Sequence, residues 1–100
     1  MVRKLLLGVA VALLMAGGSA LAADPLKIGF SMALTGGSAV NGKQLLAALQ
    51  MWREDVNAKG GLLGRPVDLV FYDDQSSQAN APGIYTKLIE VDKVDLLVGP

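Results

Sequence analysis

The sequence contains no cysteine and no histidine among its 100 residues. Without cysteine, the chain can form no disulfide, no thiolate metal site and no cysteine nucleophile. Without histidine, it lacks the side chain that most often serves as a general base or as a metal ligand. These absences exclude a Ser-His-Asp triad and the common metalloenzyme sites within this stretch. We therefore expect no catalytic residue, no metal site and no cofactor-binding residue.

Positive charge is also scarce once the N-terminus is set aside. Residues 23–100 carry seven Lys and Arg against nine Asp and Glu, a net charge of 7 − 9 = −2. Domains that bind nucleic acid gather Lys and Arg on one face. The composition therefore predicts that nucleic acid is not a partner.

The first 22 residues have the three-part layout of a secretory signal peptide. A basic pair near the start precedes an apolar core of about a dozen residues, and the A-x-A cleavage signal Ala20–Ala22 follows. The core is shorter than the roughly 20 residues that a transmembrane helix needs. We expect export and cleavage before Ala23, which divides the chain into a signal peptide, 1–22, and a mature part, 23–100.

The mature part alternates between strand-like and helix-like segments. Short apolar runs typical of strands lie at 26–32, 66–73 and 94–98, and segments with helical spacing lie at 41–59 and 78–92. Because helices connect the strands, the strands are expected to be parallel, with helices covering the sheet. This order predicts an α/β fold, the N-terminal half of a doubly wound parallel-sheet lobe. The last strand has nothing after it to cover it, so we expect the chain to be the truncated start of a longer protein.

The first helical segment has a predicted core face and predicted ends. Four apolar side chains recur at steps of four, three and four: Leu45, Leu49, Trp52 and Val56. Asn41 and Gln44 form a variant of the capping box at its start. Gly60 can adopt the left-handed conformation that commonly ends a helix. Trp52 and Tyr85 both fall at helical spacing, so we expect them to pack within the lobe rather than stack on a ligand.

The loop TGGSAVNGKQ, residues 35–44, comes within one residue of a phosphate-binding P-loop. A P-loop requires Ser or Thr after its Lys to bind the Mg²⁺ of the nucleotide, and Gln44 stands there instead. We interpret the match as coincidence. The loops after the three strands, 33–41, 73–77 and from 99 onward, are expected to meet beyond the carboxyl ends of the strands, where ligands bind. There Gly36 and Gly37 allow close backbone approach, and the helix start can face a small carboxylate. Alternatively, the glycines only turn the chain and Asn41 only caps the helix.

Asp73 and Asp74 end the second strand and raise the question of a calcium site or an acid–base pair. Adjacent residues of a strand point to opposite faces, so the two carboxylates cannot chelate together without a sharp turn. No Asp-x-Asn-Gly loop of the EF-hand type follows them. We expect one of them to accept a hydrogen bond from the backbone of the strand–helix turn.

Three segments carry a resemblance to a known family: KIGFSMALTGGSAVNGKQ, DVNAKGGLLGRPVDLVFYDDQS and VDKVDLLVGP. Together they resemble the start of the leucine/isoleucine/valine-binding type of periplasmic solute receptor, a type I periplasmic binding protein that supplies an ABC importer. The resemblance implies two α/β lobes that are joined by hinge strands and close on a small ligand. In such relatives the loop after the first strand lines the cleft, and the matching positions here are Gly37, Ser38, Ala39 and Asn41. The main ligand-binding segments would lie beyond Pro100, and the disulfide of the branched-chain receptors has no counterpart here.

We therefore predict a non-enzymatic binding protein of the periplasm, the substrate-binding component of an ABC importer. Its ligand would be an amino acid of the branched-chain type or a related small carboxylate or amide, and its partner an ABC permease in the inner membrane. A ligand-sensing domain for a membrane receptor or regulator could use the same fold, because fold alone does not fix function. An exported enzyme is less favoured, because no nucleophile–base pair is visible.

Overall fold

The computed structural model of the chain describes residues 24–100, so the predicted signal peptide and its cleavage site lie outside the described residues. The elements in chain order are β1 (Leu26–Met32), α2 (Ala39–Ala58), β2 (Val67–Asp73), a 3-10 turn (Gln78–Asn80), α3 (Ala81–Glu90) and β3 (Leu96–Leu97). Over residues 24–100, no helix combines the length and the apolar content needed to cross a membrane.

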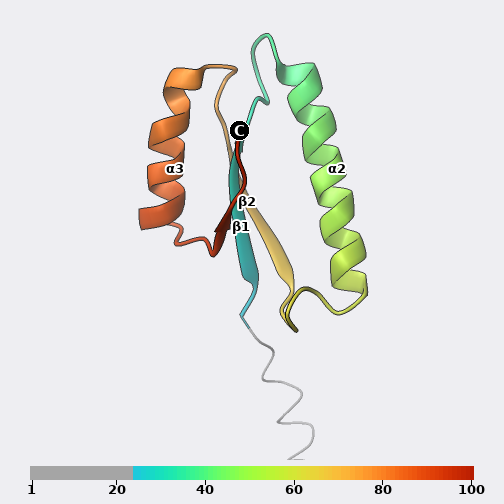
Figure 1. The fold of residues 1–100 in the computed structure, drawn as a ribbon. Helices are drawn as coiled ribbons and strands as arrows, with labels where there is room; N and C mark the ends of the chain where they lie inside the picture. Colours follow the sequence, from blue (N-terminus) through green and yellow to red (C-terminus); the bar gives the residue numbers. More distant parts are fainter. Residues whose placement is uncertain (1–23) are drawn as a thin grey trace, which may run out of the picture.

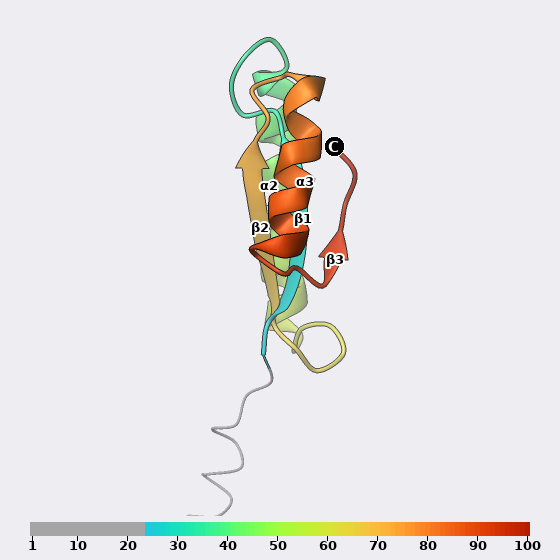
Figure 2. The same cartoon turned by 90° about the vertical axis from the view of Figure 1, so that its left-hand side faces the viewer.

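The three strands form one parallel sheet in the order β2-β1-β3. The central strand β1 pairs with β2 along its whole length, from Leu26 opposite Val67 to Met32 opposite Asp73. Helices α2 and α3 lie on opposite sides of the sheet (Figure 1), and the turned view shows the same order of layers (Figure 2). The first crossover steps from β1 to β2, and the second steps back from β2 past β1 to β3. Because right-handed crossovers in opposite directions put their helices on opposite faces, this order places α2 and α3 on the two sides of the sheet. The predicted α/β class and parallel topology are confirmed.

The main core lies between the sheet and α2. Its buried side chains come from the two long strands: Ile28, Phe30, Val67 and Leu69. The rings of Phe30 and Phe71 stack with centroids 5.3 Å apart and planes 14° from parallel. On the other face, Leu88 of α3 is fully buried and packs over Gly29, where a Cβ would come within 3.0 Å of the Leu88 side chain. The absence of a side chain at Gly29 therefore lets α3 approach β1 closely.

The predicted core face of α2 was half right. Leu49 and Val56 pack against the core as expected, but the third large apolar side chain on that face is Leu46. Leu45 is 58% exposed and Trp52 is 39% exposed. Positions 42, 46, 49, 53 and 56 follow steps of four and three, so they form one helical stripe. This stripe is selected because Gly42 at its start is buried against the backbone of Ala33.

The start of α2 differs from the prediction, whereas its end agrees with it. Ser38, not Asn41, is the N-cap residue, and it makes no side-chain capping bond. Asn41 lies exposed in the first turn, so the predicted capping box is wrong. At the other end Gly60 has a φ of 102°, and the Gly61 amide donates to the Val56 carbonyl at 2.9 Å. This is the Schellman arrangement that a glycine after a helix favours.

The second helical segment is shorter than predicted, and so is the third strand. The helix proper, α3, begins three residues after 78 and ends at Glu90. Pro82 falls within its first turn, where the missing N–H has no intrahelical partner to lose. The two-residue strand β3 covers only the centre of the predicted run 94–98. Pro82 therefore does not interrupt α3.

Candidate functional site

A cavity of about 650 Å³ opens at the carboxyl edge of the sheet, the edge at which β1, β2 and β3 end. Its lining includes Ser38 after β1, Asp74 and Ser76 after β2, Tyr85 of α3, and Pro100 beyond β3. Ligands of doubly wound sheets bind at this edge, and the volume suits a small molecule. The three loops that the sequence places here therefore do surround one cavity.

The structure places only one of the four predicted site residues in the cavity wall. Ser38 lines the cavity, and its hydroxyl is not used to cap α2. Gly37, Ala39 and Asn41 lie beside it along the chain but not in the lining. A Cβ at Gly37 would meet no atom within 4 Å, so this glycine is not required by close packing within the described residues. Contact of these three residues with a ligand stays a prediction.

Asp73 fixes the loop that follows β1. Its Oδ1 accepts from the backbone amides of Leu34, Thr35 and Gln75 at 2.9, 3.3 and 2.8 Å, and its Oδ2 accepts from the Thr35 hydroxyl at 2.7 Å. The Thr35 hydroxyl and these amides hold the pKa of Asp73 at about 2, below its ordinary 3.8. The Asp73 carboxylate therefore has a structural role, because the hydrogen bonds that it accepts come from the loops after β1 and β2.

Asp74 and Ser76 connect the loop after β2 to its neighbours. One Asp74 oxygen accepts from the Ser76 amide at 2.9 Å, and the other accepts from the Ser31 hydroxyl at 3.2 Å. The Ser76 hydroxyl donates to the Thr35 carbonyl at 2.7 Å and accepts from the Ser38 amide at 3.0 Å. The prediction that one of the two carboxylates bonds the following backbone is confirmed, and both of them do so. The linking role of Ser76 was not predicted.

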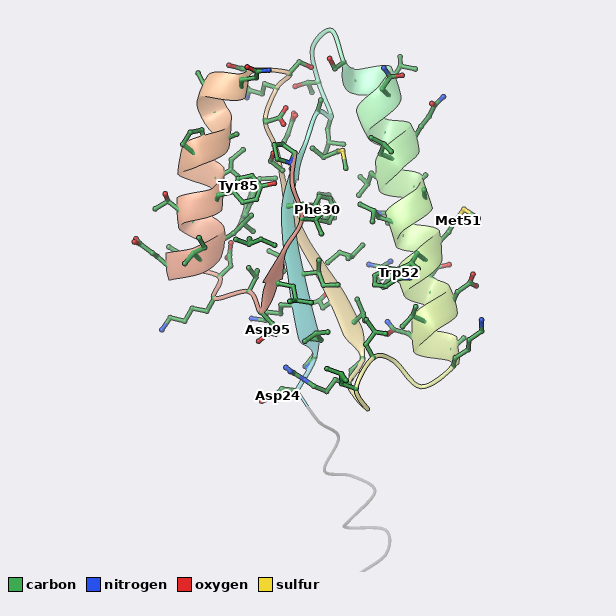
Figure 3. The ribbon with its side chains drawn as sticks, viewed as in Figure 1. Asp24, Phe30, Met51, Trp52, Tyr85 and Asp95 are labelled. Atoms are coloured by element: carbon green, nitrogen blue, oxygen red, sulfur yellow. The ribbon has the colours of Figure 1, made fainter. Side chains whose placement is uncertain are left out.

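Tyr85 was expected to pack within the lobe, and it also lines the cavity. It points from α3 toward the sheet (Figure 3). Its hydroxyl donates to the Val98 carbonyl at 2.5 Å and accepts from the Ser31 amide at 3.3 Å. The hydroxyl is therefore tied to the backbone of β1 and to the backbone that leaves β3.

Comparison with known sequences decides the family. A family model described as "Periplasmic binding protein" matches residues 25–100. The chain belongs to this family. The resemblance found in the sequence is thereby confirmed.

Two curated relatives of this periplasmic binding protein chain support the same assignment. The "Amino acid binding protein" of Pseudomonas aeruginosa is 34% identical over 97 residues, which are 97% of this chain. The "Leu/Ile/Val-binding protein homolog 2" of Brucella abortus is 30% identical over 99 residues, which are 99% of this chain. The chain spans 26% of the length of each relative.

Two solved structures share the fold. The branched-chain amino acid transporter substrate binding protein LivJ from Streptococcus pneumoniae, in complex with isoleucine, superimposes with a TM-score of 0.72 at 33% identity. The superposition covers 76% of this chain and 22% of that protein. A fatty acid ABC transporter substrate-binding protein from Thermomonospora curvata gives a TM-score of 0.65 at 34% identity, over 77% of this chain and 19% of that protein. These neighbours are substrate-binding proteins of transporters and not enzymes.

The P-loop-like match does not form a phosphate loop in this periplasmic binding protein chain. Gly37 lies in the loop before α2, but Gly42 lies inside α2 and is buried. A Cβ at Gly42 would overlap the carbonyl oxygen of Ala33, so helix packing accounts for this glycine. Lys43 is exposed on α2. The interpretation of the match as coincidence agrees with this geometry.

Metal-binding geometry is absent from the part of the chain that the structure describes. Over residues 24–100, no group of three or more Asp or Glu side chains is placed to hold a metal ion. Asp73 and Asp74 bond to the loops around them instead, as described above.

Proposed function

We propose that the protein containing this chain is the substrate-binding component of an ABC importer and captures an amino acid in the periplasm. The ligand is of the branched-chain type or a related small carboxylate or amide, and the partner is an ABC permease in the inner membrane. The observation that carries this proposal is the cavity at the carboxyl edge, where loops after all three strands meet. The names of the relatives and the signal-peptide pattern of residues 1–22 support it.

The polar groups around the cavity favour a ligand that carries both an ammonium and a carboxylate. The Asp74 carboxylate in the wall attracts a cation and repels a lone anion. The first turn of α2, a helix of 20 residues, begins beside Ser38 and presents the positive end of the helix dipole. A zwitterionic amino acid can satisfy both groups, whereas a fatty acid offers only the carboxylate.

Binding of isoleucine by the full-length protein tests this function. Calorimetry compares isoleucine and valine, which carry both charged groups, with isoleucine amide, which lacks the carboxylate, and octanoate, which lacks the ammonium group. We expect isoleucine or valine to bind and to be recovered unchanged, and octanoate not to bind. Binding of octanoate in the absence of any amino-acid binding would contradict the proposed ligand class. Release of a chemically altered ligand would contradict a binding protein.

A charge-matched pair of variants tests the role of the cavity. Asp74→Asn removes the carboxylate from the wall, and Asp68→Asn removes an exposed carboxylate from β2 outside the cavity lining. We expect isoleucine to bind more weakly to Asp74→Asn and normally to Asp68→Asn.

Isoleucine uptake by vesicles that contain the permease and its ATPase then distinguishes import from sensing, because a sensing domain would bind without supporting uptake.

A further inference from the structure

The hydrogen-bond ladder between β1 and β3 is interrupted at the edge of the cavity. Gly29 pairs with Leu97, and the Val98 amide donates to the Gly29 carbonyl at 2.9 Å. In a regular parallel ladder the next bond would run from the Ser31 amide to the Val98 carbonyl. Both of these groups bond to the Tyr85 hydroxyl instead, at 3.3 and 2.5 Å. A side chain from α3 thus replaces one backbone bond of the sheet.

The hydroxyl is suited to this position because it both donates and accepts. An amide donor and a carbonyl acceptor of the two strands each need a partner when the direct bond is lost. Ser31 is fully buried, so water is not available to satisfy its amide. Phenylalanine would fill the same space but would leave both backbone groups without their partner.

We propose that the Tyr85 hydroxyl is a positioning bridge that holds β1 and the backbone leaving β3 apart at the cavity. Pro100, two residues after the bridged Val98, lines the cavity, and so does Tyr85 itself. The bridge therefore sets where the segment after β3 stands relative to the loops after β1 and β2. Its effect on ligand affinity rests on the proposed function of this cavity, whereas its effect on the backbone does not.

Tyr72 provides a matched control for the loss of a tyrosine hydroxyl. Its hydroxyl donates to an Asp92 carboxylate oxygen at 2.7 Å, and its ring lies 4.2 Å from the Lys87 ammonium. The hydroxyl does not contact the β1–β3 ladder, and Tyr72 does not line the cavity. Tyr85→Phe and Tyr72→Phe are therefore the same chemical change, made inside and outside the proposed bridge.

The test measures amide hydrogen exchange at Val98 and isoleucine affinity in the full-length protein. We expect ligand-free Tyr85→Phe to exchange the Val98 amide about tenfold faster than the wild type, the effect of losing one hydrogen-bonded tether. Tyr72→Phe is expected to leave that exchange rate unchanged. Isoleucine affinity should fall in Tyr85→Phe and not in Tyr72→Phe.

The possible outcomes separate the bridge from the proposed function. An unchanged Val98 exchange rate in Tyr85→Phe would overturn the bridge, and so would an equal increase in both variants. Faster exchange in Tyr85→Phe alone supports the bridge even where the wild type binds no isoleucine, a result that would count against the ligand class only. Faster exchange with an unchanged isoleucine affinity would overturn the role of the bridge in positioning the binding segment.

Discussion

At the amino edge of the sheet, where the strands begin, Arg65 donates to the carbonyls of Asp24 and Pro25 at 2.8 and 3.0 Å. Its guanidinium also lies 3.5 Å from the Asp95 carboxylate. At the carboxyl edge the polar side chains of Asp74, Ser76 and Tyr85 likewise bond to neighbouring segments, but they surround a cavity of about 650 Å³. The same kinds of hydrogen bond close one edge and frame an opening at the other.

This difference between the two edges indicates where the protein can bind a ligand without disturbing its fold. At the amino edge the bonds of Arg65 join the segments that lead into the strands. The pair of bonds between Asn57 and the Val67 backbone joins the last turn of α2 to the start of β2. At the carboxyl edge the bonds join the loops that surround the cavity, so they hold these loops at fixed distances from one another. We therefore expect changes at the amino edge to lower stability without affecting isoleucine binding, whereas changes at the carboxyl edge can affect both.

The largest expected effect is that of Gly42→Ala, because it disrupts the packing of α2 against the loop after β1 at the carboxyl edge. A Cβ at Gly42 would overlap the carbonyl of Ala33, a residue in the cavity wall, so α2 must shift away from the loop after β1. We expect the free energy of unfolding to fall by about 2–3 kcal/mol, the upper range for overpacking. Isoleucine affinity should fall as well. Chemical denaturation and calorimetry on the full-length protein measure the two effects.

Gly37→Ala is the matched control for that change. The same methyl group at Gly37 would meet no atom within 4 Å. We expect the unfolding midpoint of Gly37→Ala to stay near that of the wild type. An equal loss of stability in both variants would show that the tight contact between Gly42 and Ala33 is not what holds α2 in place.

Asn57→Ala, the next largest effect, breaks the amino edge alone. The Asn57 amide group accepts from the Val67 amide at 2.7 Å and donates to the Val67 carbonyl at 3.0 Å. Val67 is only 3% exposed, so its backbone groups lose partners that water cannot fully replace. We expect a loss of about 2 kcal/mol in the free energy of unfolding. Isoleucine affinity, measured well below the unfolding temperature, should stay unchanged, and a parallel loss of affinity would show that the two edges are coupled.

Local signals in the sequence predicted most of the fold. The period of the apolar residues gave the strands and helices their order, and Gly60 marked the end of α2, because both signals depend on residues close in sequence. The start of α2 could not be predicted in this way. Ser38 is fixed there by a bond from its amide to the hydroxyl of Ser76, a residue 38 positions away in sequence. The choice between Leu45 and Leu46 for the core was equally open, since both are near neighbours of Leu49 on a helix.

The candidate site was predictable in position but not in composition. The rule that ligands bind beyond the carboxyl ends of parallel strands placed Ser38 and the Asp73–Ser77 loop correctly at one edge. Tyr85 was assigned to packing because its spacing is helical. The partners of its hydroxyl, Ser31 and Val98, lie 54 and 13 residues away in sequence. No local pattern records a contact of that kind.

The smallest expected effect concerns Asp73, whose carboxylate bonds to the loops after β1 and β2 and makes the stability of the carboxyl edge depend on pH. The pKa of Asp73 is about 2 in the folded protein against an ordinary 3.8, chiefly because the Thr35 hydroxyl donates to its carboxylate. Between these values the unfolded chain binds more protons, so the contribution of Asp73 to stability is present above about pH 4 and is lost as the pH falls to about 2.

Thermal unfolding of the full-length wild type and Asp73→Asn, followed from pH 7 to pH 2, tests this. We expect the variant to unfold at a lower temperature at pH 7 and the gap to narrow between about pH 4 and pH 2, while the carboxylates that both proteins share cancel in the difference. Thr35→Val, which removes the first cause of the shift, should reduce the narrowing. A gap that stays constant down to pH 2 would show that the carboxylate charge does not hold the loops of this edge.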